Sequence, residues 1–313
     1  MDVPVLVIQD LHKRYGDVRA LDGVSLTVEQ GELIGVLGPN GAGKTTMVSI
    51  ICGLRRADRG RVEVCGVDAL ANPQAARRHI GLAPQDLGIY PIDTVRQNLA
   101  LFGELSGLRG ERLWDQIATV AGALRLTELM GRKAGELSGG QKRRLHTAIA
   151  LLGEPSLILL DEATTGADVE SRAALIEVVK GLAERGSSVL YSTHYLGEVE
   201  DLGARVVIID QGRVIAEGSI PELLASSGGS IVELVFDGPP PTLNGRPTTS
   251  HDSTVRLRVE DPARSLGPIF SELGPAAARL QSVEIIDSSL ETVFLQLTGR
   301  RYRPEEVLDV MAP

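Results

Sequence analysis

The stretch "LIGVLGPNGAGKTT", residues 33–46, decides the fold. An apolar run of strand length leads into a glycine-rich loop that fits G-x-x-x-x-G-K-[ST], and a helical pattern follows. Backbone N–H groups from Asn40 to Lys44 can surround phosphate oxygens, because glycine tolerates the required dihedrals. The Lys44 ammonium would neutralise phosphate charge, and the Thr45 hydroxyl would face Mg²⁺. The sequence therefore predicts a nucleotide phosphate site between a strand and a helix.

A second apolar run, "SLILLDE" at residues 156–162, ends in two carboxylates. Burying paired acids is costly unless a cation or a polar partner compensates them. Asp161 therefore suits Mg²⁺, and Glu162 suits the polarisation of an attacking water. Alone, this pattern is more typical of an ordinary exposed strand end. Beside a phosphate loop it indicates nucleotide hydrolysis.

A third stretch, "ELSGGQKRRL" at residues 136–145, reads as a loop that feeds a helix start. Such a start offers unpaired N–H groups and a positive dipole, which suit an anion. Lys142, Arg143 and Arg144 add positive charge in the first turn and oppose the dipole by roughly 0.3–1 kcal/mol each. By itself the stretch is more typical of a solvated basic turn, and these residues alone do not identify an anion. The helix is indicated by apolar residues at i, i+3, i+4 and i+7: Leu145, Ala148, Ile149 and Leu152.

The composition of the 313 residues is that of a soluble protein large enough for two domains. A net charge of −9 argues against a general nucleic-acid binder. Cys52 and Cys65 lack metal-type spacing, so we expect reduced thiols in a cytosolic protein. No apolar run approaches the ~20 residues that span a bilayer. Any membrane part is therefore expected from another chain.

Apolar runs alternate with helical patterns through about residue 222, which predicts an α/β core rich in parallel strands. "VLVIQDLHKRY" and "VSLTVEQGE" near the start are more typical of antiparallel strands. "DQGR" at 210–213 is typical of a hairpin turn. We expect helices over 94–106, 110–124, 140–152, 170–185 and 195–202.

The composition changes after Leu224, and we expect two domains, 1–224 and 225–313. "ASSGGS" at 225–230 is a candidate linker, and 237–253 is too rich in proline and turn residues for regular structure. "IVELVF", "TVRLRVE" and "LQSVEII" are typical of strands, with helical patterns at 262–273 and 290–298. The second part is therefore expected to be a small α+β accessory domain.

The three motifs, in this order, resemble the nucleotide-binding subunit of an ATP-binding cassette (ABC) transporter. LSGGQ at 137–141 is similar to that family's signature, and the resemblance covers residues 5 to about 222. It implies an α/β, P-loop ABC-type nucleotide-binding domain with an antiparallel β subdomain and a helical subdomain. The small α+β C-terminal domain would follow. The implied activity is ATP hydrolysis with Mg²⁺.

The resemblance also implies roles for single residues. Tyr15 matches the aromatic residue that stacks on adenine, and Asp168 in "TTGAD" matches the D-loop aspartate. Catalytic roles fall to Glu162, to His194 in "YSTH" and to Gln85 in "LAPQD". Metal contacts fall to Thr45, Gln85 and Asp161. The nucleotide loop comprises Gly38, Pro39, Asn40, Gly41, Ala42, Gly43, Lys44, Thr45 and Thr46.

In this family two cassettes pack head to tail, and the signature of one closes over the ATP of the other. The resemblance therefore implies that the anion at the third stretch belongs to a partner's nucleotide. This chain has one cassette, so we expect a second nucleotide-binding subunit, either another copy or a paralogue. A transmembrane permease is the other expected partner, at the cytoplasmic face of the membrane, and nucleic acid is not expected. The signature residues are Ser138, Gly139, Gly140 and Gln141.

The segment "YPIDTVRQNL" and the tail "DSSLETVFLQLTGR" resemble exporter ATPases of the daunorubicin-resistance type. The expected cargo is a drug, a lipid or another hydrophobic molecule. An importer ATPase is an alternative, although we see no regulatory barrel or ligand-sensing pattern in the tail. A soluble ABC ATPase acting on nucleic acid or ribosomes is another, although no heptads separate Lys44 from Leu137 and the chain has only one cassette.

Overall fold

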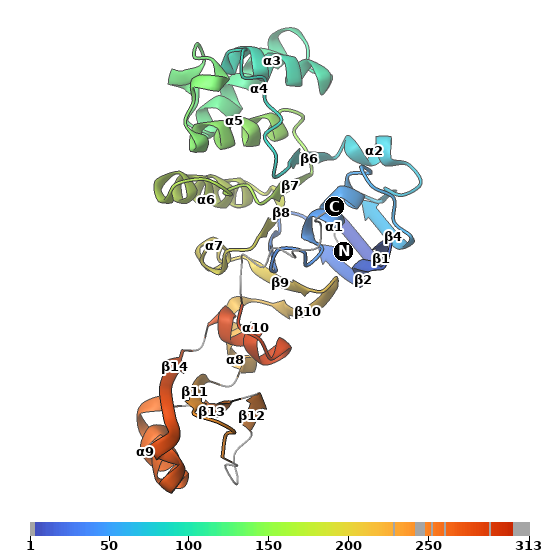
Figure 1. Cartoon of the computed structure of the whole chain (residues 1–313). Helices are drawn as coiled ribbons and strands as arrows, with labels where there is room; N and C mark the ends of the chain where they lie inside the picture. The colour runs from blue at the N-terminus through green and yellow to red at the C-terminus, as the bar shows by residue number, and fades with distance from the viewer. Residues whose placement is uncertain are drawn as a thin grey trace. The chain divides into compact units, whose positions relative to one another are not determined.

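The computed structural model describes residues 4–227, 229–241, 248–251, 253–259, 261–287 and 289–302. The chain divides into two compact units, the first ending at Glu217 and the second beginning at Gly218. Most elements of both units are labelled in Figure 1. Each unit has its own sheet and its own core.

A six-stranded sheet with the order β10-β9-β3-β8-β7-β6 forms the centre of the first unit. The pairs β9–β3, β3–β8, β8–β7 and β7–β6 are parallel, as the apolar runs predict. Gln211 and Gly212 both have positive φ between β9 and β10, which suits the predicted tight turn. The strands are β3 Leu33–Leu37, β6 Ile80–Ala83, β7 Leu157–Asp161, β8 Ser188–Thr193, β9 Arg205–Asp210 and β10 Arg213–Gly218.

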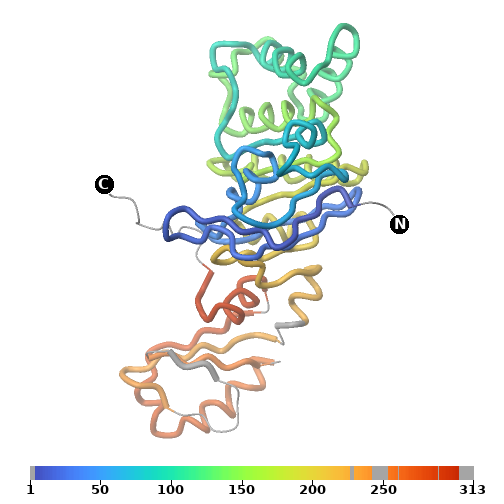
Figure 2. The backbone as a smooth tube through the Cα atoms, turned by 90° about the vertical axis from the view of Figure 1, so that its right-hand side faces the viewer, coloured from blue at the N-terminus to red at the C-terminus, as the bar shows by residue number. Residues whose placement is uncertain are grey.

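A second, antiparallel sheet with the order β2-β1-β4-β5 confirms the expected antiparallel subdomain. In Figure 2 its first two strands cross the unit as a long blue hairpin. Strands β4 and β5 were not predicted from the sequence. The strands are β1 Leu6–Tyr15, β2 Val18–Val28, β4 Arg59–Val64 and β5 Val67–Asp68.

Helices α3, α4 and α5 gather at one end of the unit in Figures 1 and 2, which confirms the expected helical subdomain. All five predicted helices of this unit begin and end within one residue of the structure. The short helix α2, Pro73–Arg77, was missed. The others are α1 Lys44–Ile51, α3 Val95–Leu105, α4 Gly110–Ala123, α5 Gly139–Leu151, α6 Val169–Glu184 and α7 Leu196–Leu202.

Strand β7 separates two apolar clusters, because its side chains alternate between the sheet faces. Leu157 and Leu159 pack in the cluster that contains α1 and the antiparallel sheet. Ile158 and Leu160 pack in the cluster that contains α3, α4, α5 and α6. Helices α1 and α5 therefore lie on opposite faces of the parallel sheet.

The second unit is an antiparallel sheet, ordered β12-β13-β11-β14, with helices α8, α9 and α10 among its described residues. Its core joins one face of β11 and β13 to Ile269 and Leu273 of α9. Both predicted helices match α9 and α10. The elements are α8 Ile220–Ser227, β11 Ser230–Phe236, β12 Thr248–His251, β13 Thr254–Val259, α9 Pro262–Leu273, β14 Leu280–Ile286 and α10 Leu290–Thr298.

The predicted linker at 225–230 is wrong, because α8 continues to Ser227 and β11 begins at Ser230. Ser219 and Glu222 exchange hydrogen bonds that start α8, with the Ser219 N–H donating to Glu222 Oε2 over 2.8 Å. Leu223 is buried. The expected domain boundary after residue 224 therefore falls inside a helix, and the compact units divide at Gly218 instead.

The stretch 237–253, expected to be irregular, contains β12 at Thr248–His251, which pairs with β13. Residues 242–247 of that stretch lie outside the described residues. The tail helix α10 buries Leu290, Val293 and Phe294, while Leu297 is 51% exposed. Its apolar face therefore packs largely within its own unit, where α10 lies against α8.

Candidate functional site

The loop between β3 and α1 requires glycine at two close approaches. A Cβ on Gly38 would lie 2.3 Å from the carbonyl oxygen of Ile209, and one on Gly43 would lie 2.4 Å from that of Ala20. Gly43 also has a φ of 109°, in the left-handed region. Helix α1 starts at Lys44 without a side-chain cap, so its first N–H groups face the loop. This arrangement fits an anion such as phosphate.

Lys44 is buried beneath this loop, with 4% of its surface exposed. Its Nζ donates to the carbonyl oxygens of Gly38 at 2.7 Å and Pro39 at 3.2 Å. The same atom lies 3.4 Å from Glu162 Oε1. Burial lowers the pKa of Lys44, and the charge of Glu162 opposes that shift. The structure thus holds a buried cation between the loop and the end of β7.

Asp161 and Glu162 differ in environment although they are adjacent. Burial raises the pKa of Asp161. Hydrogen bonds from the Ser192 and Thr45 hydroxyls oppose that shift. Burial also opposes ionisation of Glu162, but its hydrogen bond with His194 and the charge of Lys44 outweigh burial and lower its pKa. Glu162 is therefore an ionised carboxylate at neutral pH.

Glu162 sits at the carboxyl end of β7 with a φ of 49°, which is uncommon for a residue other than glycine. Its Oε1 lies 3.2 Å from His194 Nδ1, and its Oε2 accepts a hydrogen bond from the Thr165 hydroxyl over 3.3 Å. The structure therefore brings together five of the predicted residues: Lys44, Thr45, Asp161, Glu162 and His194.

The oxygen atoms at this site suit a hard divalent cation. Thr45 and Asp161 offer a hydroxyl and a carboxylate that are already in contact. Among the described residues there is no group of three or more His, Cys, Asp or Glu side chains arranged to hold a metal. This donor set fits Mg²⁺, which typically takes one or two protein ligands and completes its shell with water and phosphate.

Other predicted residues lie apart from this cluster. Tyr15 ends β1 and is 43% exposed, and Lys13 Nζ lies 5.3 Å from the centre of its ring. Asp168 caps α6, where it accepts hydrogen bonds from the Ser171 N–H at 2.8 Å and hydroxyl at 3.1 Å. Gln85 is exposed, and its main-chain carbonyl accepts from Arg143 Nη1 over 2.5 Å.

The signature segment, Leu137–Gln141, forms the start of α5. Ser138 Oγ accepts from the Gln141 N–H over 3.3 Å, and Gln141 Oε1 accepts from the Ser138 N–H over 3.0 Å. This capping box pairs both side chains within the segment itself. The segment begins a helix on the sheet face opposite α1, so within one chain it is separate from the cluster around Lys44.

The basic residues after the signature have a structural role that was not predicted from the sequence. Arg143 donates to the carbonyl oxygens of Gln85 at 2.5 Å and Thr165 at 3.1 Å. Arg144 donates to those of Leu124 and Arg125, both at 3.3 Å. These arginines join α5 to three loops instead of forming a solvated turn. No sequence pattern marks these carbonyl acceptors.

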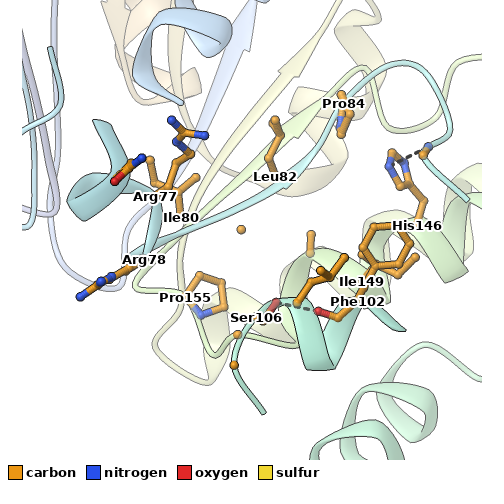
Figure 3. Close-up of a pocket in the computed structure, with 17 residues that line it drawn as sticks. Arg77, Arg78, Ile80, Leu82, Pro84, Phe102, Ser106, His146, Ile149 and Pro155 are labelled. Atoms are coloured by element: carbon orange, nitrogen blue, oxygen red, sulfur yellow. Dashed lines mark hydrogen bonds between the residues drawn. The ribbon is translucent and has the colours of Figure 1, made fainter. Parts of the chain in front are cut away.

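A cavity of about 660 Å³ lies between β6 and helices α3 and α5 (Figure 3). Its wall includes Leu82 of β6, Phe102 of α3 and Ile149 of α5, with Arg77 and Arg78 at one side. His146 also lines it, and the dashed line from its ring in Figure 3 is the hydrogen bond that Nε2 accepts from the Gly88 N–H at 3.3 Å. Burial lowers the pKa of His146 to about 4, so this ring is neutral.

No helix in the described part of the chain has the length and apolar character needed to cross a bilayer.

A family model described as "ABC transporter" matches residues 21–165. The chain is 37% identical over 312 residues to the daunorubicin resistance ATP-binding protein DrrA2 of Streptomyces coeruleorubidus, covering 96% of this chain and 97% of that protein. It is 36% identical over 305 residues to the Nod factor export ATP-binding protein I of Burkholderia lata, covering 96% and 99%. Among solved structures, the dimeric structure of the bacterial ABC transporter cassette MJ0796 is similar, with a TM-score of 0.62. That cassette is 27% identical and covers 68% of this chain and 98% of its own.

Proposed function

This chain belongs to the ABC transporter family, as one of its ATP-binding, ATP-hydrolysing subunits, and we propose that it powers an exporter through a separate transmembrane partner. The cargo class is that of its relatives, which are named for drug resistance and for Nod factor export. The observation that carries the proposal is the buried cluster of Lys44, Glu162 and His194 beneath the glycine loop.

Each member of this cluster has a chemical use. Lys44 binds the β- and γ-phosphates together with the backbone N–H groups from Asn40 to Lys44. Glu162, ionised and oriented by His194, accepts a proton from the attacking water. His194 lies beside Glu162 and contacts the terminal phosphate. Because Glu162 also pairs with Lys44, phosphate oxygens that take up the Lys44 charge leave Glu162 free to act as a base.

Thr45, Asp161 and Gln85 are the residues that would hold Mg²⁺, which would supply positive charge beside the phosphate oxygens. The exposed ring of Tyr15 offers a flat surface on which adenine can stack. Ala20 and Ile209, whose carbonyl oxygens lie against Gly43 and Gly38, hold the loop close to the sheet.

The signature segment completes the site of a second cassette, either another copy of this chain or a paralogue. Gly139 and Gly140 supply N–H groups at the start of α5, and Ser138 and Gln141 hold that start in shape. Asp168 lies close by, because a Cβ on Gly140 would lie 1.9 Å from the Oγ of Ser171, which Asp168 binds. The dimeric MJ0796 cassette supports this arrangement.

The cavity beside β6 is the docking site that we propose for the membrane partner. Its wall combines apolar and polar side chains and includes Pro84 and Gly88 on either side of Gln85, and Arg77 and Arg78 at one side favour an acidic partner segment. Movement of that loop would reach α5 through Arg143 and His146. The chain would then lie at the cytoplasmic face of the membrane, where ATP is available.

Replacing the proposed base tests this function. In the full chain Glu162→Gln should bind ATP within about threefold of wild type, while turnover falls by about 10²-fold or more, because the water loses its base. The matched control is Glu184→Gln, an exposed carboxylate at the end of α6. Phosphate release and binding of a fluorescent ATP analogue are the two readouts. Wild-type turnover by Glu162→Gln would contradict the assignment.

A further inference from the structure

Glu198 on α7 is a buried carboxylate that the proposed chemistry leaves unused. Only 2% of its surface is exposed. Four groups converge on it: the Thr164 hydroxyl, the Tyr191 hydroxyl at 3.0 Å, the Thr193 hydroxyl at 2.5 Å and Arg172 Nε at 3.2 Å. A buried charge is tolerable when it is paired and hydrogen-bonded to this degree.

The four partners come from the segments that carry the proposed hydrolytic residues. Thr164 lies two residues after Glu162, in the loop that leaves β7. Thr193 is the last residue of β8, directly before His194. Arg172 lies in the first turn of α6, where its N–H donates to the carbonyl oxygen of the cap residue Asp168 over 2.9 Å. The Glu198 carboxylate thus joins the loop after β7, the end of β8 and the first turn of α6.

A second set of contacts reaches His194 from the same arginine. The guanidinium carbon of Arg172 lies 4.4 Å from the ring centre of Tyr195, and the Tyr195 ring centre lies 4.1 Å from that of His194. Thr193 Oγ1 also accepts a hydrogen bond from the Tyr195 N–H over 3.0 Å. Glu198 therefore restrains the turn at His194 through both Thr193 and Arg172.

We propose that Glu198 is a positioning residue for hydrolysis, which fixes Glu162 and His194 relative to each other without contributing to nucleotide affinity. This inference rests on the proposed function. The separation from binding follows from the geometry, because the described contacts of Lys44 are with Gly38, Pro39 and Glu162. The described contacts of the Glu198 carboxylate are with the loop after β7, with β8 and with α6. Displacement of a reacting group by about 1 Å can cost about 10²-fold in rate.

The test compares Glu198→Ala with Glu198→Gln in the full chain. Alanine removes the acceptor for three hydroxyl groups and the carboxylate that pairs with Arg172, so kcat should fall by about 10²-fold while the ATP-analogue Kd changes less than about twofold. Glutamine keeps the size of the side chain and an oxygen that accepts from two hydroxyls, so it should restore most of kcat. The matched control is Glu200→Ala, an exposed carboxylate on the same helix, with wild-type kcat and Kd.

Thr193→Val provides a second variant that preserves shape if Glu198→Ala does not fold. It removes one donor to Glu198, and we expect about tenfold lower kcat at unchanged Kd. Wild-type kcat in Thr193→Val, and in Glu198→Ala where that variant folds, would overturn the inference. A loss of affinity that matches the loss of kcat would overturn it too, since this indicates general damage to the site. Failure of the proposed function is distinguishable, because it appears as turnover by Glu162→Gln.

Discussion

The phosphate loop and the signature segment are both glycine-rich helix starts, yet their surroundings differ. At α1 the helix has no side-chain cap, and a buried lysine and two carboxylates lie beside it. At α5 the segment pairs its own side chains, Ser138 with Gln141, and the arginines that follow bind neighbouring loops. The first region holds its chemistry within one chain. The second is a shaped surface whose ligand comes from elsewhere.

The glycines make the same distinction. Gly38 and Gly43 allow backbone to approach backbone, while Gly140 allows α5 to approach Ser171 of α6. Gly139 differs from these three glycines because it has ordinary room, with the nearest atom to an added Cβ at 3.6 Å. Packing within this chain therefore does not require glycine at position 139. Because Gly139 also lies in the signature segment, we expect the second subunit's nucleotide to approach it there.

The largest expected effect comes from Lys44→Ala. Removing the ammonium leaves Glu162 without its cation and the phosphates without theirs, so we expect ATP affinity to fall by about 10²-fold. Titration with a fluorescent ATP analogue measures this. Lys180→Ala on α6 is the control, since that ammonium pairs only with the exposed Glu177 among its described contacts. Retained affinity in Lys44→Ala would remove the distinction between the two helix starts.

Gly140→Ala and Gly139→Ala should separate packing from ligand binding. The Gly140 Cβ would lie 1.9 Å from Ser171 Oγ, so that variant should lose about 1–3 kcal/mol of stability. Gly139→Ala should stay within about 0.5 kcal/mol of wild type and still hydrolyse ATP more slowly. Urea unfolding and phosphate release measure the two effects. Full activity in Gly139→Ala would argue that no group of the second subunit closes on this position, where alanine adds a methyl group.

The pKa of Glu162 predicts a pH dependence of stability. A carboxylate with a lowered pKa stabilises the fold above its ordinary pKa of 4.5, and this contribution is lost as pH falls through the lowered value. Wild type should therefore exceed Glu162→Gln in stability at pH 7, and the difference should narrow below about pH 4.5. Urea unfolding from about pH 7.5 to about pH 4 tests this. A difference that widens on acidification would mean that the pKa of Glu162 is raised.

The smallest effect is expected from truncation after Ser219, which removes the second unit at its boundary. ATP affinity should stay within about twofold, because the described cluster lies wholly before Gly218. Truncation after Leu224 cuts α8 and should yield a less stable product, which thermal unfolding would show. We propose that the removed unit serves assembly or coupling, so dimerisation should weaken. Loss of ATP affinity by the Ser219 product would oppose an independent accessory unit.

The sequence predicts the first unit well because its signals are local. Continuous apolar runs mark buried parallel strands, and Thr94 with Gln97, like Ser138 with Gln141, marks a helix start within one residue. Order along the chain also places Lys44, Asp161 and His194 at the ends of neighbouring strands, where parallel topology gathers them. The resemblance supplies the rest, including Tyr15, Gln85 and Asp168, which the described contacts do not join to this cluster.

What the sequence could not predict depends on contacts between distant segments. Arg143 finds Gln85 and Thr165, and Glu198 finds donors on β8, α6 and the loop after β7, with no pattern that signals either. The linker prediction failed for a related reason. "ASSGGS" has the composition of a linker, but α8 is stabilised by its start at Ser219 and by packing against α10.

We propose that ATP is hydrolysed at a site shared between two subunits. Mixing Lys44→Ala protein with Gly139→Asp protein tests whether the site is shared. The introduced carboxylate would repel a phosphate of the partner's nucleotide, yet aspartate suits a helix start, so this variant should fold. Each variant alone should be inactive. A mixed dimer of this chain holds one site with both defects and one with neither, so the account predicts that phosphate release returns on mixing. Confirmed mixed dimers with no more activity than the two parents would contradict it.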